Sequence, residues 1–184
     1  MELIRNNFIV ITGGPGGGKS SLVQALSGKG FGYIHETGRS IIKERISKGL
    51  SPRPGVEEFA RLMFQRDYEN FLNNSVISET LFFDRSFLDS ALFIQPTDTA
   101  WFQRSKDIIM NYRFNPAVFI TPPWEEIYRN DDERDQSFDE SVKTYEKLYT
   151  WYPLYGYKLI VLPKVSVEKR ADFILNRIKL HHLS

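Results

Sequence analysis

Cysteine is absent from this chain of 184 residues. Disulfides, thiolate metal sites and cysteine nucleophiles are therefore excluded, while a reducing compartment is permitted. Long hydrophobic runs are missing too. The first residues, MELIRNNFIVITGG, contain only a short apolar segment, well below the length of a signal sequence or a membrane span. We therefore expect a cytoplasmic protein without a membrane span.

The chain also lacks an excess of charge, with 24 Lys and Arg residues against 23 Asp and Glu residues. A general nucleic-acid binder needs a net basic surface, so we expect no nucleic-acid partner. The guanine-reading patterns N-K-x-D and T-K-x-D do not occur in the sequence. Their absence argues against a Ras-like switch.

Short apolar runs alternate with longer segments of helical period, which is typical of β-α units and a parallel sheet. We expect one domain over residues 1–184 with the three-layer α/β/α architecture and five parallel strands. The expected strands are 8–12, 30–35, 80–84, 117–121 and 157–162. The expected helices are 19–27, 38–48, 56–73, 87–94, 101–112, 137–151 and 167–179. Ser137 and Ser166 are predicted N-caps, and Pro153 is predicted to end the long helix.

The stretch FIVITGGPGGGKSS, residues 8–21, contains the pattern G-x-x-x-x-G-K-S directly after an expected strand. Glycines let the chain turn tightly and aim backbone N–H groups at phosphate oxygens, while Lys19 reaches the β- and γ-phosphates and Ser20 ligates Mg²⁺. The sequence therefore predicts a site for ATP or GTP with Mg²⁺; the alternative is a flexible glycine turn. The predicted nucleotide-binding residues are Gly13, Gly14, Pro15, Gly16, Gly17, Gly18, Lys19, Ser20 and Ser21.

An apolar strand, TLFFD, ends in Asp84 and is followed by Arg85. An acid at the carboxyl end of a central strand faces the crevice where open α/β sheets bind ligands. Asp84 is predicted to hold Mg²⁺ or to orient a substrate hydroxyl, and Arg85 to bind phosphate or fix the acid. The alternative is that Asp84 caps the next helix and Arg85 lies in solvent.

The second expected strand ends in YIHETGR, which places Glu36 at a comparable point. Glu36 is a candidate general base that accepts a proton from the hydroxyl of the phosphate acceptor. Arg39 lies three residues further on and is predicted to reach the same cleft and bind the substrate. The alternative for Glu36 is an ordinary acid in a surface loop.

Four stretches carry a family resemblance over residues 8–175. YIHETGRSIIKE, ARLMFQRDYENF, FFDRSFLD and AVFITPPWEEIYRNDDERDQSFDESVKTYE resemble the predicted-ATPase family of P-loop proteins with nucleoside-kinase-like folds, which also carries an AAA label. This family is similar to deoxynucleoside kinases and to the ribosylnicotinamide kinase domain of NadR-type proteins. The resemblance implies a P-loop nucleotide-binding domain with a kinase-like site.

The resemblance to deoxynucleoside kinases also implies roles for individual residues. Glu36 matches their general base, and residues 84–86, Asp-Arg-Ser, match their Glu-Arg-Ser motif with Asp in place of Glu. Gln65 in MFQRDY matches a helix glutamine that reads the base. Glu36, Arg39, Gln65 and Arg85 are thus the predicted substrate-binding residues.

Residues 128–136, YRNDDERDQ, lie where those kinases have a lid, although their Arg-Gly-Arg lid pattern is missing. We expect a charged lid near 123–137, in which Arg129 and Arg134 clamp the transferring phosphate because its charge spreads over equatorial oxygens. The alternative is a solvated loop.

The sequence thus favours a Mg²⁺-dependent phosphotransferase, in which Glu36 or Asp84 accepts the proton of a small hydroxyl acceptor such as a nucleoside or nucleotide. Lys19, Arg85, Arg129 and Arg134 complete the predicted catalytic set. The alternatives are a nucleotide-dependent switch or slow NTPase that contacts a lipid or protein, and a scaffold with a vestigial loop. The sequence is also compatible with a homodimer.

Overall fold

A parallel sheet of five strands forms the centre of the molecule in the computed structural model, which describes residues 2–94, 99–128 and 137–181. Its strand order confirms the expected α/β class, with β2 in the middle. In that order the strands are β3 (Gly32–Ile34), β4 (Leu81–Asp84), β2 (Phe8–Gly13), β6 (Ala117–Thr121) and β7 (Lys158–Val161).

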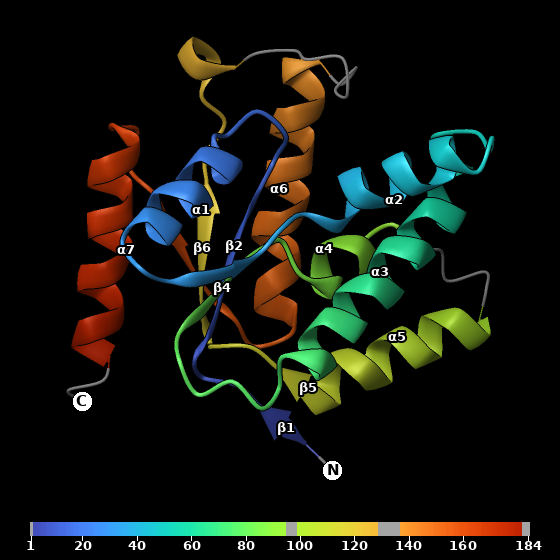
Figure 1. The fold of residues 1–184 in the computed structure, drawn as a ribbon, viewed down its shortest axis with the longest axis horizontal. Helices are drawn as coiled ribbons and strands as arrows, with labels where there is room; N and C mark the ends of the chain where they lie inside the picture. Colours follow the sequence, from blue (N-terminus) through green and yellow to red (C-terminus); the bar gives the residue numbers. More distant parts are fainter. Residues whose placement is uncertain (1, 95–98, 129–136, 182–184) are drawn as a thin grey trace.

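Helices cover both faces of the sheet and make the three layers that the alternating pattern predicts (Figure 1). One face is covered by α1 (Lys19–Gly28) and α7 (Val167–His181). The other is covered by α3 (Val56–Asn73), α4 (Phe87–Ala91), α5 (Thr99–Asn111) and α6 (Phe138–Leu154). The remaining long helix, α2 (Thr37–Ser47), packs on α3.

Side chains of the central strand alternate between two apolar cores. Phe8 and Val10 pack with α3 to α6, whereas Ile9 and Ile11 pack with α1 and α7. Because both faces are covered, β2 is a continuous apolar run and is buried at every residue. Many of the aromatic residues fill the larger core, where the rings of Phe71 and Phe114 meet edge to face at 5.0 Å.

The structure departs from the sequence-based expectations in three small elements. A second, two-stranded sheet joins β1 (Leu3–Ile4) to β5 (Tyr112–Arg113), and a 3-10 helix, η1, spans Glu125–Ile127. The helix α6 continues through Pro153 to Leu154, so the prediction that Pro153 ends it was wrong by one residue. A proline near the last turn removes a single N–H, and Tyr155 closes the turn by donating to Tyr152 O.

The strand order places three carboxyl ends next to one another. In the register of the sheet, Ile11 of β2 pairs with Asp84 of β4, and Gly13 of β2 pairs with Thr121 of β6. The loop after β2 and the acid at the end of β4 therefore share one edge of the sheet, where open α/β sheets bind ligands.

Candidate active site

The loop between β2 and α1 curls around the Lys19 side chain. Gly13 and Gly18 have φ values of 136° and 75°, which glycine adopts at little cost, and a Cβ at Gly13 would collide with the Thr121 side chain. Lys19 Nζ donates to Gly13 O at 3.2 Å and to Gly14 O at 2.7 Å, and only 5% of the residue is exposed. This segment, residues 13–21, is called the phosphate loop below.

The outer side of the phosphate loop packs against α6 and the chain after η1. Ser141 Oγ donates to Pro15 O at 2.6 Å, and a Cβ at Gly14 would run into Ser141. A Cβ at Gly16 would collide with the ring of Tyr128. Contacts from these distant segments, as well as the glycines, therefore hold the loop in shape.

Asp84 and Ser20 meet where β4 ends beside the start of α1. Ser20 Oγ donates to Asp84 Oδ2 at 3.4 Å, whereas the buried Asp84 Oδ1 has no hydrogen-bond partner among the described residues. Burial raises the pKa of Asp84, and the nearby cation of Lys19 acts in the opposite direction. An orphaned carboxylate oxygen beside a hydroxyl fits a Mg²⁺ site. Ser21, next in α1, is exposed.

The described part of the chain contains no cluster of three or more His, Asp or Glu side chains that could hold a metal by itself. Ser20 and Asp84 are the described residues that could hold a Mg²⁺ ion, which proteins usually bind through one or two carboxylates together with substrate phosphates.

Arg85 joins the two carboxylates Glu36 and Asp89. Its Nε donates to Glu36 Oε1 at 3.2 Å, and its Nη1 donates to Asp89 Oδ1 at 3.3 Å. Burial by itself lowers the pKa of the Arg85 guanidinium, but Glu36, Asp89 and Asp84 together raise it. Arg85 is also the only non-glycine residue with positive φ in the described ranges, at 75°. Such backbone strain concentrates at functional sites.

Asp89 belongs to this site, although the sequence did not predict it. Besides Arg85, its carboxylate accepts hydrogen bonds from the Thr12 hydroxyl, from Ser86 N at 3.0 Å and from the Tyr152 hydroxyl at 2.5 Å. Ser86 and Asp89 form the capping box of α4. The S-x-x-D spacing after Arg85 is the signal that could have identified Asp89.

A cavity of about 370 Å³ opens beside these residues, between the phosphate loop and the helices α2, α3, α4 and α6. The predicted substrate-binding residues Glu36, Arg39 and Arg85 line it together with Asp89, and so does Arg53, which was not predicted. The apolar part of the lining consists of Ile42, Val56, Phe59, Ala60, Met63, Phe93 and Leu148. The cavity thus combines charged groups near the phosphate loop with an apolar wall.

Gln65 lies away from this cavity. Its side chain is exposed on α3, and its Nε2 donates to Glu69 Oε1 at 3.1 Å. Met63, two residues earlier on α3, lines the cavity instead. The structure therefore does not bring Gln65 together with Glu36 and Arg85.

A family profile described as an AAA domain matches residues 8–170, which is most of the chain. The chain belongs to this AAA-domain family. No curated protein sequence matches it significantly.

Solved structures place the AAA-domain chain among P-loop kinase folds. Deoxyadenosine kinase from M. mycoides, with products dCMP and a flexible dCDP bound, superposes with a TM-score of 0.70 at 18% identity, covering 94% of this chain and 98% of that one. The NadR protein in complex with NR superposes with a TM-score of 0.72 at 16% identity, covering 93% of this chain and 51% of that one. Shikimate kinase from Acinetobacter baumannii, in complex with shikimate, gives 0.60 at 12% identity, with coverages of 96% and 95%.

The predicted lid of the AAA-domain chain is described only at its two ends. Arg129 and Arg134 lie outside the described residues. On one side, Tyr128 follows η1 and packs on the phosphate loop. On the other, Ser137 is the N-cap of α6, as predicted, and it forms a capping box with Glu140. The rings of Tyr128 and Phe138 meet at 5.4 Å. Both ends of the segment thus lie close together beside the phosphate loop.

No helix among the described residues of the AAA-domain chain is long and apolar enough to cross a membrane.

A buried carboxyl, Asp67, lies in α3 close to the cavity. Ser90 lines the cavity, and its Oγ donates to Asp67 Oδ2 at 3.4 Å. Burial raises the pKa of Asp67 to about 8, with a smaller contribution from the charge of Asp89. Asp67 therefore keeps its proton at neutral pH in the folded protein but loses it in the unfolded chain.

Asp67→Asn is expected to flatten the dependence of stability on pH. Because the folded pKa lies above the ordinary value of 3.8, the native state holds the extra proton between these two values, and stability falls as pH rises through that window. In wild type, this group is expected to lower the free energy of unfolding by about 1.4 kcal/mol per pH unit, and Asp67→Asn should lose that slope. Urea unfolding of the two proteins across this range measures it.

Glu69→Gln on the exposed side of α3 is the matched control and should keep the wild-type slope. The assignment of a proton to Asp67 is wrong if the free energies of unfolding of wild type and Asp67→Asn differ by the same amount at every pH in the window.

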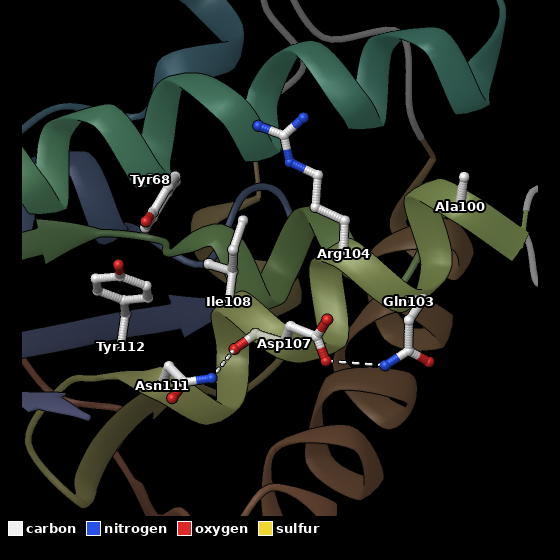
Figure 2. A pocket seen from close by; sticks show the side chains of 8 residues that line it. All are labelled: Tyr68, Ala100, Gln103, Arg104, Asp107, Ile108, Asn111 and Tyr112. Atoms are coloured by element: carbon white, nitrogen blue, oxygen red, sulfur yellow. Dashed lines mark hydrogen bonds between the residues drawn. The ribbon is translucent and has the colours of Figure 1, made fainter. Parts of the chain in front are cut away.

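A second hollow, of about 680 Å³, lies between α3 and α5 and shares no lining residue with the first cavity (Figure 2). Within it, Gln103 Nε2 donates to Asp107 Oδ1 at 2.8 Å, and Asn111 Nδ2 donates to Asp107 O at 2.8 Å. These polar groups of α5 bond mainly to one another, so the hollow does not add to the candidate active site.

Proposed function

We propose that the chain is a Mg²⁺-dependent phosphotransferase that moves the γ-phosphoryl group of ATP or GTP to a hydroxyl of a small acceptor. The observation that carries this proposal is that Glu36 and Arg85 line the same cavity as Pro15 of the phosphate loop. An acceptor in that cavity would meet a base and a cation where the phosphate loop would present the nucleotide's phosphates.

In the proposed reaction, Lys19 and the backbone N–H groups of the phosphate loop hold the β- and γ-phosphates. Glu36 accepts the proton of the acceptor hydroxyl while the acceptor oxygen bonds to the γ-phosphorus and the bond to the β-γ bridging oxygen breaks. Arg85 fixes Glu36 through its Nε and adds positive charge. A Mg²⁺ ion held by Ser20 and Asp84 would neutralise charge on the phosphates.

Of the two bases that the sequence allows, the geometry favours Glu36. Asp84 bonds to Ser20 of the phosphate loop and is not part of the cavity lining, whereas Glu36 is. Asp84 is accordingly assigned to Mg²⁺. Arg129 and Arg134 of the lid near 123–137 are assigned to closing over the transferred phosphate.

The acceptor class follows from the cavity. Its apolar wall, which includes the rings of Phe59 and Phe93, suits a ring-bearing molecule, and its volume of about 370 Å³ lies in the range of small-molecule sites. A nucleoside or nucleotide fits this description. Support comes from structural neighbours named deoxyadenosine kinase and shikimate kinase. We infer that the chain works as one domain over residues 1–184 and acts on cytoplasmic metabolites.

The test is acceptor-dependent ADP formation by the purified protein with ATP and Mg²⁺. A panel of nucleosides, nucleotides, nicotinamide riboside and shikimate is compared with a reaction that lacks an acceptor. At least one acceptor is expected to raise ADP formation above that background, and Lys19→Ala should abolish the increase because it removes the cation at the phosphates.

If ATP binds but no acceptor raises ADP formation, the phosphotransferase proposal fails. A slow, acceptor-independent hydrolysis would then favour a nucleotide-dependent switch.

A further inference from the structure

The phosphate loop contacts a second cation, the guanidinium of Arg170. This residue lies one turn into α7, and only 3% of it is exposed. Its Nη1 donates to Gly17 O at 3.1 Å. A Cβ at Gly18 would lie 3.0 Å from its Nη2, so the guanidinium packs directly on the backbone between these two glycines. The contact joins residues 153 positions apart in the chain.

The hydrogen bond to Gly17 O decides where the next backbone N–H points. In a trans peptide the carbonyl and the following N–H point in opposite directions, and the described chain has no cis peptide. Gly17 O faces Arg170, so Gly18 N–H points to the opposite side of the peptide, away from Arg170. Because this peptide lies between two glycines, its rotation is sterically cheap. Arg170 is therefore placed to prevent the peptide from flipping.

The charge of Arg170 is unusual because it is buried without an ion pair. No carboxylate of the described residues forms an ion pair with Arg170, and its Nε is buried without a hydrogen-bond partner. Burial lowers its pKa, and the charge of Glu168 opposes this only in part. The guanidinium lies 5.6 Å from the centre of the Trp124 ring. A buried cation that forms no ion pair costs free energy. A polyphosphate in the loop would supply negative charge nearby.

We propose that Arg170 is a positioning residue of the phosphate loop: it holds the peptide between Gly17 and Gly18 with its N–H toward the phosphates and adds a second positive charge to that of Lys19. This rests on the nucleotide-binding half of the proposed function and not on the acceptor. The ligand feature that it recognises is the polyphosphate and not the base.

The experiment compares Arg170→Met with Arg170→Lys and with Arg177→Met. Arg177 is a matched control because it lies on the same helix and also over an aromatic ring, 5.4 Å from the centre of Phe173, but is exposed. Isothermal titration with ATP and Mg²⁺ gives the affinities. Arg170→Met should weaken binding about 10- to 100-fold and Arg170→Lys about 3- to 10-fold, since a charge-assisted hydrogen bond is lost or weakened. Arg177→Met should stay within about twofold.

Binding of inorganic tripolyphosphate distinguishes the proposed role from recognition of the base, and the melting temperature distinguishes it from a purely structural role. The affinity for tripolyphosphate should fall by the same factor as that for ATP in Arg170→Met, because the base is not involved. Without ligand, this variant should melt close to wild type, because removal of a buried cation that forms no ion pair offsets the loss of the hydrogen bond to Gly17 O. The proposal is overturned if only ATP binding falls, if Arg170→Met binds like Arg177→Met, or if the melting temperature drops while both affinities are unchanged.

Failure of the two proposals can be told apart. If wild type binds ATP, transfers nothing, and loses affinity on Arg170→Met, the phosphotransferase proposal fails and the role of Arg170 stands. If transfer occurs and Arg170→Met binds normally, the reverse holds. Wild type that binds neither ATP nor tripolyphosphate overturns both.

Discussion

Glu36→Gln is expected to lower acceptor-dependent turnover about 1,000-fold and to leave the Kd for ATP within about twofold, since a general base contributes 10²- to 10⁴-fold. The amide cannot take the proton of the acceptor, although it keeps the size of the side chain that contacts Arg85. Nucleotide binding should survive because the phosphate loop holds the phosphates through Lys19 and the backbone. Steady-state kinetics and a nucleotide titration provide the two numbers.

Glu44→Gln is the matched control for this change. Glu44 lies in α2, the helix that Glu36 precedes, but it pairs with Lys48 and Arg66 outside the cavity lining. This variant should turn over like wild type. Normal turnover by Glu36→Gln would remove Glu36 from the mechanism and favour a switch, which does not need a base.

Asp89→Ala is expected to destabilise the protein by about 3–5 kcal/mol, the typical cost of breaking a buried charge pair. The change removes the acceptor of bonds from Thr12, Ser86, Tyr152 and Arg85, so several buried donors lose their partner. Arg85 would then be held by Glu36 alone, and turnover should fall as well. Urea unfolding measures the loss of stability.

Asp172→Ala is the control, because it shows how much stability is lost when an acid at the surface is removed. Asp172 pairs with Lys29 at 2.9 Å, and 59% of its side chain is exposed. Its removal should cost at most about 1 kcal/mol, as for most surface ion pairs. An Asp89→Ala protein as stable as Asp172→Ala would show that the Asp89 network does not hold the site together.

Much of the site could be predicted because it is local in sequence. The phosphate loop, the acid after the TLFFD strand and the acid after the second strand are each set by a strand that ends where a helix begins. Parallel strands bring their carboxyl ends to one edge, so the sequence alone allows Lys19, Asp84 and Glu36 to be expected together. Ser137 was predictable for the same reason, because a capping box spans four residues.

The rest depends on contacts between distant segments. Tyr152 reaches Asp89 across 63 positions, and Arg170 reaches Gly17 across 153. The hydrophobic periodicity of the sequence does not indicate such pairs. Gln65 illustrates a different difficulty, because the face of α3 that meets the cavity depends on how the helix packs, and Met63 occupies that face instead.

The smallest elements were missed for lack of length. β1 and β5 have two residues each, so neither shows the alternation by which a strand is recognised. The positive φ of Arg85 is likewise invisible in the sequence, since nothing about arginine favours that conformation.

The most direct test of the central claim is the fate of the γ-phosphoryl group. Wild-type protein is incubated with γ-labelled ATP, Mg²⁺ and the protein-free metabolite fraction of a cell extract, with Glu36→Gln in parallel. The account predicts that the label moves to an organic phosphate ester with wild type and not with the variant. Label that appears only as inorganic phosphate, in equal amounts for both proteins, would contradict it.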